Sequence, residues 1–120
     1  MSANHALFFV FNGPRDGKAA QMMENNNAIR AYWNKKKTAG EIETFETVIL
    51  ASSGNPHMPA GFTLVTGDRA KLHKIRWDDV EFLNLHTVAM VTTNGYACVD
   101  GYAGEELNKH IQRLSSLSGK

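Results

Sequence analysis

The sequence predicts an α+β domain in which helices cover one face of an antiparallel sheet. Short runs rich in β-branched and aromatic residues alternate with longer segments of helical period, and turn residues separate them. These segments follow the order strand, helix, strand, strand, helix, strand, with one further helix at the end. A chain of 120 residues has room for one domain, so we treat residues 1–120 as a single unit.

The first half of the chain opens with a strand and a helix. Ala6–Phe11 (ALFFVF) is a continuous apolar run that ends at turn residues, which is typical of a buried strand. Gly17–Lys37 then has apolar residues at helical spacings and three lysines in its last turn, where cations suit the negative end of the helix dipole. Gly40 follows, as expected for a residue that stops a helix.

Gly40–Leu50 (GEIETFETVIL) is the stretch around which we expect the sheet to be organised. Its β-branched and aromatic residues favour a long strand, and neither alternate set of side chains is purely polar. We therefore predict a strand covered on both faces. The helices of one small chain cover only one face of a sheet, so a second copy of the chain is the expected cover for the other.

The second half continues the pattern. Ser52–Ala60 consists of turn residues and predicts an irregular loop, and Gly61–Thr66 predicts a third strand. Asp68 is positioned to cap a short helix after it. Near the end, Tyr96–Tyr102 predicts the last strand, and Gly104–Leu117 predicts a helix with apolar residues on one face.

Asp78–Val91 is compatible with either a helix or a strand. The run is rich in β-formers, but Phe82, Leu85 and Ala89 also lie on one helical stripe. Asp78, with Glu81 three residues later, has the form of a capping box, so we favour the helix. The resulting βαββαβ order is that of the ferredoxin-like arrangement, an antiparallel sheet with helices on one face, here with an extra C-terminal helix.

Composition excludes several classes of function. Thirteen Lys and Arg balance twelve Asp and Glu, so the net charge of +1 gives no electrostatic signature of nucleic-acid or anionic-membrane binding. The apolar run at the N-terminus is too short to span a bilayer and lacks a basic leader. The single cysteine, Cys98, cannot form an intramolecular disulfide, which favours a reducing compartment. We expect a cytoplasmic protein.

The segment from Gly61 to Tyr102 (GFTLVTGDRAKLHKIRWDDVEFLNLHTVAMVTTNGYACVDGY) resembles the dimeric α/β-barrel superfamily. That superfamily includes antibiotic-biosynthesis monooxygenase-like, haem-degrading and stress-responsive barrel proteins, and the chain is similar to its small uncharacterised bacterial members. The resemblance implies a helix for Asp78–Val91 and a homodimeric barrel. It implies less about activity, because proteins of this fold have unrelated functions.

The resemblance also implies a set of candidate catalytic residues. Members that act on haem or on quinol-like aromatics pair a histidine of the second helix with asparagine and tryptophan. His86, Asn12 and Trp77 are the matching candidates, with His86 as proton acceptor or haem ligand and the other two orienting the ligand. The alternative interpretation is that His86 is a satisfied, partly buried histidine and Trp77 an anchor at the surface.

Aromatic residues suggest a cleft for a flat ligand. Tyr32 and Trp33 fall on the first helix, and Phe45 and Phe62 on adjoining strands, so the four side chains can line one cleft or form core and dimer interface instead. The other histidines and Cys98 have no zinc-ligand spacing, so we expect no metal and no tightly bound cofactor.

Three functions follow from these candidates. The first is a homodimer that binds a small aromatic molecule and acts on it by cofactor-independent oxygenation or isomerisation. The second is a non-catalytic, stress-related or regulatory dimer. The third is a protein that binds or degrades haem. An open cleft lined by His86 favours the first, and a cleft filled by side chains such as Met22 and Phe82 favours the second.

Overall fold

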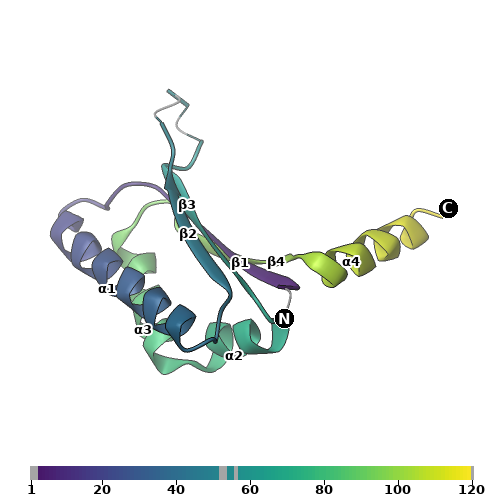
Figure 1. The fold of residues 1–120 in the computed structure, drawn as a ribbon. Helices are drawn as coiled ribbons and strands as arrows, with labels where there is room; N and C mark the ends of the chain where they lie inside the picture. The colour runs from purple at the N-terminus through teal and green to yellow at the C-terminus, as the bar shows by residue number, and fades with distance from the viewer. Residues whose placement is uncertain (1–2, 52–53, 56, 120) are drawn as a thin grey trace.

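The computed structural model, which describes residues 3–51, 54, 55 and 57–119, contains one four-stranded antiparallel sheet with the strand order β2-β3-β1-β4. Helices α1, α2 and α3 cover one face of this sheet, whereas α4 extends away from the end of β4 (Figure 1). The strands are β1 (His5–Phe11), β2 (Thr44–Ile49), β3 (Gly61–Gly67) and β4 (Ala97–Tyr102). The helices are α1 (Ala19–Thr38), α2 (Arg69–Asp78), α3 (Val80–Thr92) and α4 (Gly104–Leu117). The predicted ferredoxin-like order with an added C-terminal helix is confirmed.

Strand β1 lies in the middle of the sheet, between β3 and β4. Leu7 and Phe9 point toward the helices and belong to the hydrophobic core, together with Val65 of β3. The continuous apolar run of β1 is therefore explained by its central place, because both of its faces are packed or flanked by apolar neighbours.

The prediction that Gly40–Leu50 forms one long strand is wrong in its length. The strand is restricted to β2, Thr44–Ile49, and it occupies one edge of the sheet, paired only with β3. Ile42 is buried in the core just before the strand begins. The apolar residues of this stretch therefore reflect an approach to the core followed by a half-exposed edge strand.

Helix α1 tolerates three consecutive asparagines because one of them is tied to α3. Asn25 is buried, and its side-chain amide donates a hydrogen bond to the Leu85 backbone carbonyl at 3.0 Å. Tyr32 and Trp33, about two turns further on, are buried in the core. A polar residue and two aromatic rings together fix the packing of α1 against α3.

The ambiguous segment after β3 is helical, as the resemblance implied, but its cap is one residue later than predicted. Asp68 caps α2 and accepts from the Lys71 backbone amide at 3.1 Å. Asp79, and not Asp78, caps α3 and accepts from the backbone amides of Glu81 at 3.0 Å and Phe82 at 3.3 Å. Its extended backbone separates α2 from α3.

The loop predicted between Ser52 and Ala60 connects β2 to β3. Residues 52, 53 and 56 of that loop lie outside the described residues. The remaining residues of the loop form neither helix nor strand, and the Leu50 amide donates to the Ala60 carbonyl at 2.8 Å where the two strands meet.

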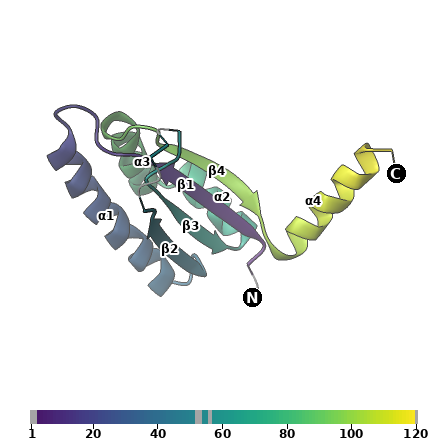
Figure 2. The same ribbon diagram turned by 90° about the horizontal axis from the view of Figure 1, so that it is seen from above.

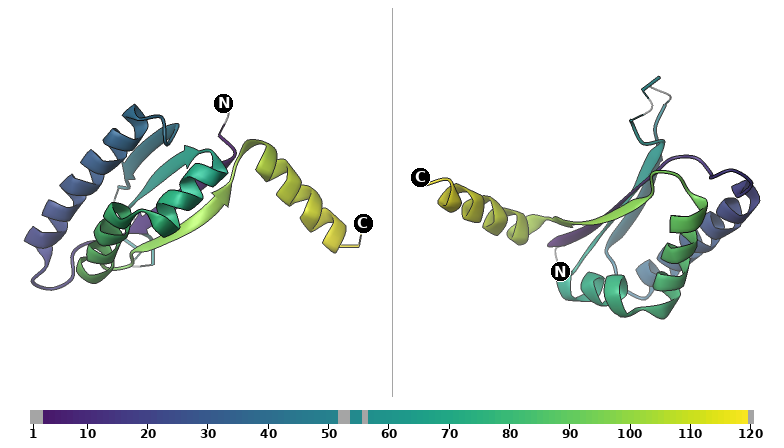
Figure 3. Two further views of the ribbon diagram at one scale, coloured as in Figure 1. Left: turned by 90° about the horizontal axis from the view of Figure 1, so that it is seen from below. Right: turned by 180° about the vertical axis from the view of Figure 1, so that it is seen from behind.

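The sheet face turned away from α1, α2 and α3 is mainly apolar. Strand alternation and register place Phe8 opposite Leu64 on one side and Val99 on the other, and Val10 opposite Phe62 and Ala97. Figures 2 and 3 show that none of the helices formed by the described residues covers this face and that α4 projects from the end of β4. The exposed residues of α4 include an apolar stripe formed by Leu107, Ile111, Leu114 and Leu117. No helix in the described part of the chain is long and apolar enough to cross a membrane.

Candidate functional site

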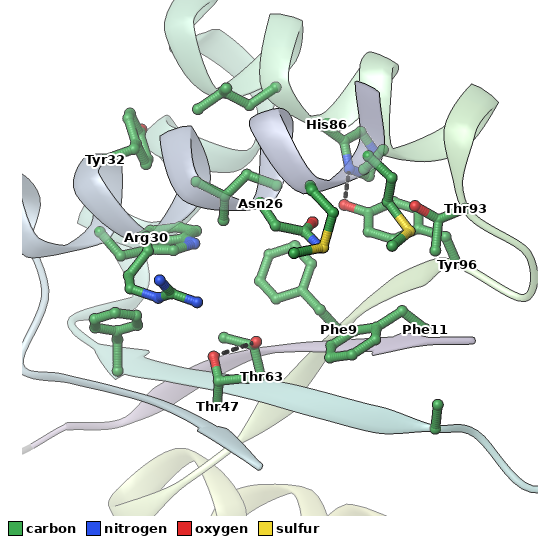
Figure 4. A pocket seen from close by; sticks show the side chains of 18 of the residues that line it. Phe9, Phe11, Asn26, Arg30, Tyr32, Thr47, Thr63, His86, Thr93 and Tyr96 are labelled. Atoms are coloured by element: carbon green, nitrogen blue, oxygen red, sulfur yellow. Dashed lines mark hydrogen bonds between the residues drawn. The ribbon is translucent and has the colours of Figure 1, made fainter. Parts of the chain in front are cut away.

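A cavity of about 340 Å³ lies between the sheet and the pair of helices α1 and α3 (Figure 4). Its walls are largely apolar, with Phe9 and Phe11 from β1, Ile29 and Trp33 from α1, and Ala89 from α3. Thr47 of β2 and Thr63 of β3 lie side by side on the sheet side, with their hydroxyl groups 2.8 Å apart. The size and the lining suit a small organic ligand.

His86 and Tyr96 form a hydrogen-bonded pair in the cavity wall. The Nδ1 atom of His86 lies 2.6 Å from the Tyr96 hydroxyl oxygen. His86 projects from the middle of α3, and Tyr96 directly precedes β4, so the Asn94-Gly95 turn brings the two together. The imidazole also stacks on the ring of Phe82, with 5.3 Å between ring centroids and 17° between the planes. Packing and hydrogen bonding thus hold the imidazole in one orientation.

The surroundings keep both members of the pair uncharged at neutral pH. Burial lowers the pKa of His86 below its usual value, and the positive charge of Arg76 lowers it further. Burial raises the pKa of the Tyr96 hydroxyl well above its usual value. The neutral imidazole therefore has one nitrogen that accepts a proton, and the hydroxyl retains its own.

Other polar groups line the rest of the cavity. Asn12 follows β1, and Asn26 and Arg30 project from α1. Figure 4 shows Arg30 reaching from α1 toward the sheet at one end of the cavity, with the His86–Tyr96 pair at the other end. The Tyr32 hydroxyl is engaged elsewhere, because it donates to Asp79 at 2.8 Å.

Of the three predicted catalytic residues, the structure brings two together. His86 and Asn12 both line the cavity, whereas Trp77 does not. Trp77 is 52% exposed on α2, where the Arg76 guanidinium lies 4.1 Å from the centre of its ring. Helix period explains this position: Ile75 faces the core, and two residues further the side chain points to the opposite side. Trp77 therefore lies at the surface, as the alternative interpretation expected.

Of the four predicted aromatic ligand-binding residues, three line the cavity. Tyr32 and Trp33 contribute from α1 and Phe45 from β2. Phe62 lies on the other face of the sheet and packs against Phe8, with ring centroids 5.4 Å apart. Because side chains alternate along a strand, Thr63 faces the cavity and its neighbour Phe62 cannot.

Arg30 and Tyr96 are among the residues of the site that were not predicted from the sequence. Arg30 lies four residues after Asn26 and three before Trp33, and this helical spacing was the signal that places all three on one side of α1. Tyr96 was assigned to the last strand only. No local signal connects it with His86, since their contact depends on how tightly the chain turns after α3.

Within the described residues, no group of three or more His, Cys, Asp or Glu side chains is placed to hold a metal ion. Cys98 lies beside the cavity wall in β4, and burial raises the pKa of its thiol to about 11. Such a thiol is poorly ionised at neutral pH and is a weak nucleophile.

Comparison with known proteins identifies the fold. No family model and no curated protein matches the sequence. The chain is similar in structure to a hydroxynitrile lyase from Passiflora edulis, with a TM-score of 0.62 and 11% identity over 84% of this chain and 94% of that chain.

Two further similar structures are bacterial. A dimeric ferredoxin-like protein of unknown function from Jannaschia sp. has a TM-score of 0.60 and 10% identity, over 84% of this chain and 98% of that chain. A DABB-family protein with a ferredoxin-like fold from Mesorhizobium loti has a TM-score of 0.50 and 12% identity, over 86% of this chain and 99% of that chain. The resemblance seen in Gly61–Tyr102 is confirmed as a likeness of fold.

Proposed function

We propose that this protein is a homodimer in which each subunit binds a small, partly aromatic molecule between the sheet and helices α1 and α3. In this proposal His86 accepts a proton from the bound molecule and Tyr96 assists. The observation that carries the proposal is the cavity of about 340 Å³ with the His86–Tyr96 pair in its wall. Met22 and Phe82 line this cavity and do not fill it, which supports a ligand over a purely structural dimer.

The hydrogen bond between His86 and Tyr96 allows an acid and a base to lie side by side. When the Nδ1–H group of His86 donates to the tyrosine oxygen, Nε2 has a free lone pair and the hydroxyl proton is free to point elsewhere. Nε2 then accepts a proton from the ligand while the hydroxyl donates a hydrogen bond to a developing oxyanion. This chemistry suits isomerisation or cofactor-independent oxygenation, the two reaction classes that the resemblance favours.

The homodimer is supported by the apolar sheet face that carries Phe8, Phe62 and Leu64, and by the dimeric state named for the Jannaschia protein. A face of this kind is a typical protein interface. The lone thiol, Cys98, supports a reducing compartment, and we propose a cytoplasmic location.

The binding step is tested with 2-tetralone, a small aromatic ketone, by following backbone amide shifts in NMR and affinity by calorimetry. We expect shifts at Thr47, Thr63 and Ala89 and none on α4. Thr47→Trp places a ring in the cavity from an exposed position on β2 and should weaken binding about tenfold or more. The matched variant Thr87→Trp, exposed on α3 and outside the cavity, should bind as the wild type does.

The proton-transfer step is tested with the same ketone in deuterium oxide. A base that removes a proton beside the carbonyl group exchanges it for deuterium, and NMR records the rate. We expect exchange above the buffer rate, reduced about a hundredfold in His86→Gln with binding retained. Binding without exchange would support the regulatory binding module. Absence of binding, or a hemin Soret shift that is lost in His86→Ala, would contradict the proposal, and the Soret result would favour the haem protein.

A further inference from the structure

The described residues that line the cavity include a cationic side chain but no acidic one. Arg30 is the one formally charged side chain among the described residues that line it, since His86 is neutral. Neither Glu43 nor Glu46, the acidic residues nearest in sequence to the β2 part of the lining, belongs to it. The cavity thus combines apolar walls with one exposed cation that no acidic side chain of its lining neutralises.

The Arg30 guanidinium has no hydrogen bond or ion pair with any other described residue. Arg69, by contrast, pairs with Glu106, with 3.4 Å between guanidinium nitrogen and carboxylate oxygen. Arg30 instead reaches from α1 toward the sheet over the cavity, as Figure 4 shows. Its planar fork of donors is therefore available to a ligand and matches the two oxygens of a carboxylate.

We infer that the ligand is an amphipathic monocarboxylate, with its carboxylate on Arg30 and its apolar body between the aromatic walls. This inference rests on the proposed ligand-binding function and names the class of ligand. A positively charged ligand would be repelled by Arg30. A neutral ligand would leave the guanidinium without an ionic partner. The carboxylate end and the His86–Tyr96 pair lie at opposite ends of the cavity, so the reacting group of the ligand is distant from its carboxylate.

The test compares three ligands that share one aromatic body: 2-naphthoate, 2-naphthamide and protonated 2-(aminomethyl)naphthalene. Calorimetry at low salt should give the tightest binding for the naphthoate, about tenfold over the naphthamide, because a charge-assisted hydrogen bond at an exposed site has this effect. The aminomethyl compound should bind most weakly. High salt should narrow the difference between naphthoate and naphthamide.

Variants at Arg30 test whether this side chain causes the preference for naphthoate over naphthamide. Arg30→Gln should bind naphthoate and naphthamide equally, and Arg30→Lys should restore part of the preference, since a lysine has the charge without the fork. Arg113→Gln makes the same change on the exposed surface of α4 and should leave the preference intact. Arg30 is exposed, so its variants should fold, and circular dichroism checks this.

Each outcome decides between the two proposals. Equal binding of naphthoate and naphthamide by the wild type, or a preference that persists in Arg30→Gln, would overturn the carboxylate inference while the ligand-binding cavity stands. If none of the three compounds binds, the inference and the proposed function both fail.

Discussion

Asp79 joins three parts of the helical layer through one carboxylate. It caps α3, accepts from the Tyr32 hydroxyl at 2.8 Å, and lies 2.9 Å from the Lys36 ammonium group. Burial raises the pKa of Asp79, but the hydrogen bonds from Lys36, Tyr32 and the Phe82 amide outweigh it, so the pKa lies below its usual value. An ionised carboxylate at this junction therefore stabilises the wall that carries Tyr32 and Phe82.

We predict that Asp79→Ala lowers the free energy of unfolding by about 2–3 kcal/mol, from the lost helix cap and an unpaired buried hydroxyl. Denaturant unfolding at neutral pH measures this. The lowered pKa means that the contribution is present above the carboxyl pKa of the unfolded chain, near 3.9, and is lost as pH falls through the folded value. The difference between wild type and variant should therefore shrink in acid.

Asp78→Ala is the matched control for Asp79→Ala. Asp78 is exposed and has no described partner, so its loss should change the free energy of unfolding by about 0.5 kcal/mol or less. Equal losses in the two variants would contradict the assignment of the cap.

Local chemistry alone does not distinguish these two aspartates. Asp78 has Glu81 three residues after it and so satisfies the capping-box pattern better than Asp79 does. Tyr32 and Lys36 decide between them, and both arrive from α1, more than forty positions earlier in the sequence. Asp68, by contrast, was identified correctly as a cap, because no competing acid lies beside it.

Among the elements, α4 was predicted with its observed bounds, Gly104–Leu117. Its apolar residues follow a regular helical spacing, and the residues on either side of it do not suggest another element. Strand β2 was predicted too long, because the β-forming residue types of Gly40–Leu50 do not show that Ile42 packs in the core before the strand begins at Thr44. The order of the elements could thus be predicted from the sequence, whereas the bounds of one element depend on contacts from elsewhere in the chain.

Helix α4 makes few contacts with its own subunit and exposes an apolar stripe, although most such stripes in proteins are covered. In the proposed homodimer, we expect the second copy to cover this stripe. We predict that Ile111→Ser with Leu114→Ser raises the dimer dissociation constant about tenfold or more, because two apolar side chains lose their partner. Sedimentation over a concentration series measures it.

The control for this pair is Asn108→Ser with Gln112→Ser, two exposed polar positions on the same helix. These changes should leave the dissociation constant unchanged. The same loss of dimer in both double variants would mean that helix stability, and not the apolar stripe, matters for association.

At the scale of the whole molecule, the sheet has one face covered by helices and one that no helix in the described part of the chain covers. Val99 lies on the uncovered face and is 54% exposed. We predict that Val99→Lys dissociates the dimer, because burying the ammonium group in an apolar interface is costly. Light scattering coupled to gel filtration at micromolar concentration gives the mass.

Val91→Lys makes the same substitution on α3, at a residue 55% exposed that lies away from the sheet, and should remain dimeric. A wild-type chain that is folded and monomeric at micromolar concentration would refute the dimer, and with it the role given to the apolar face.

The chain contains two tryptophans, one buried and one exposed. Trp33 in the cavity wall is 1% exposed, and Trp77 on the outer side of α2 is 52% exposed. Iodide in solution therefore quenches the emission of Trp77 and leaves that of Trp33, whose fluorescence then reports on whatever enters the space beside it. The fluorescence of Trp33 therefore reports ligand binding in the cavity without an added dye or label.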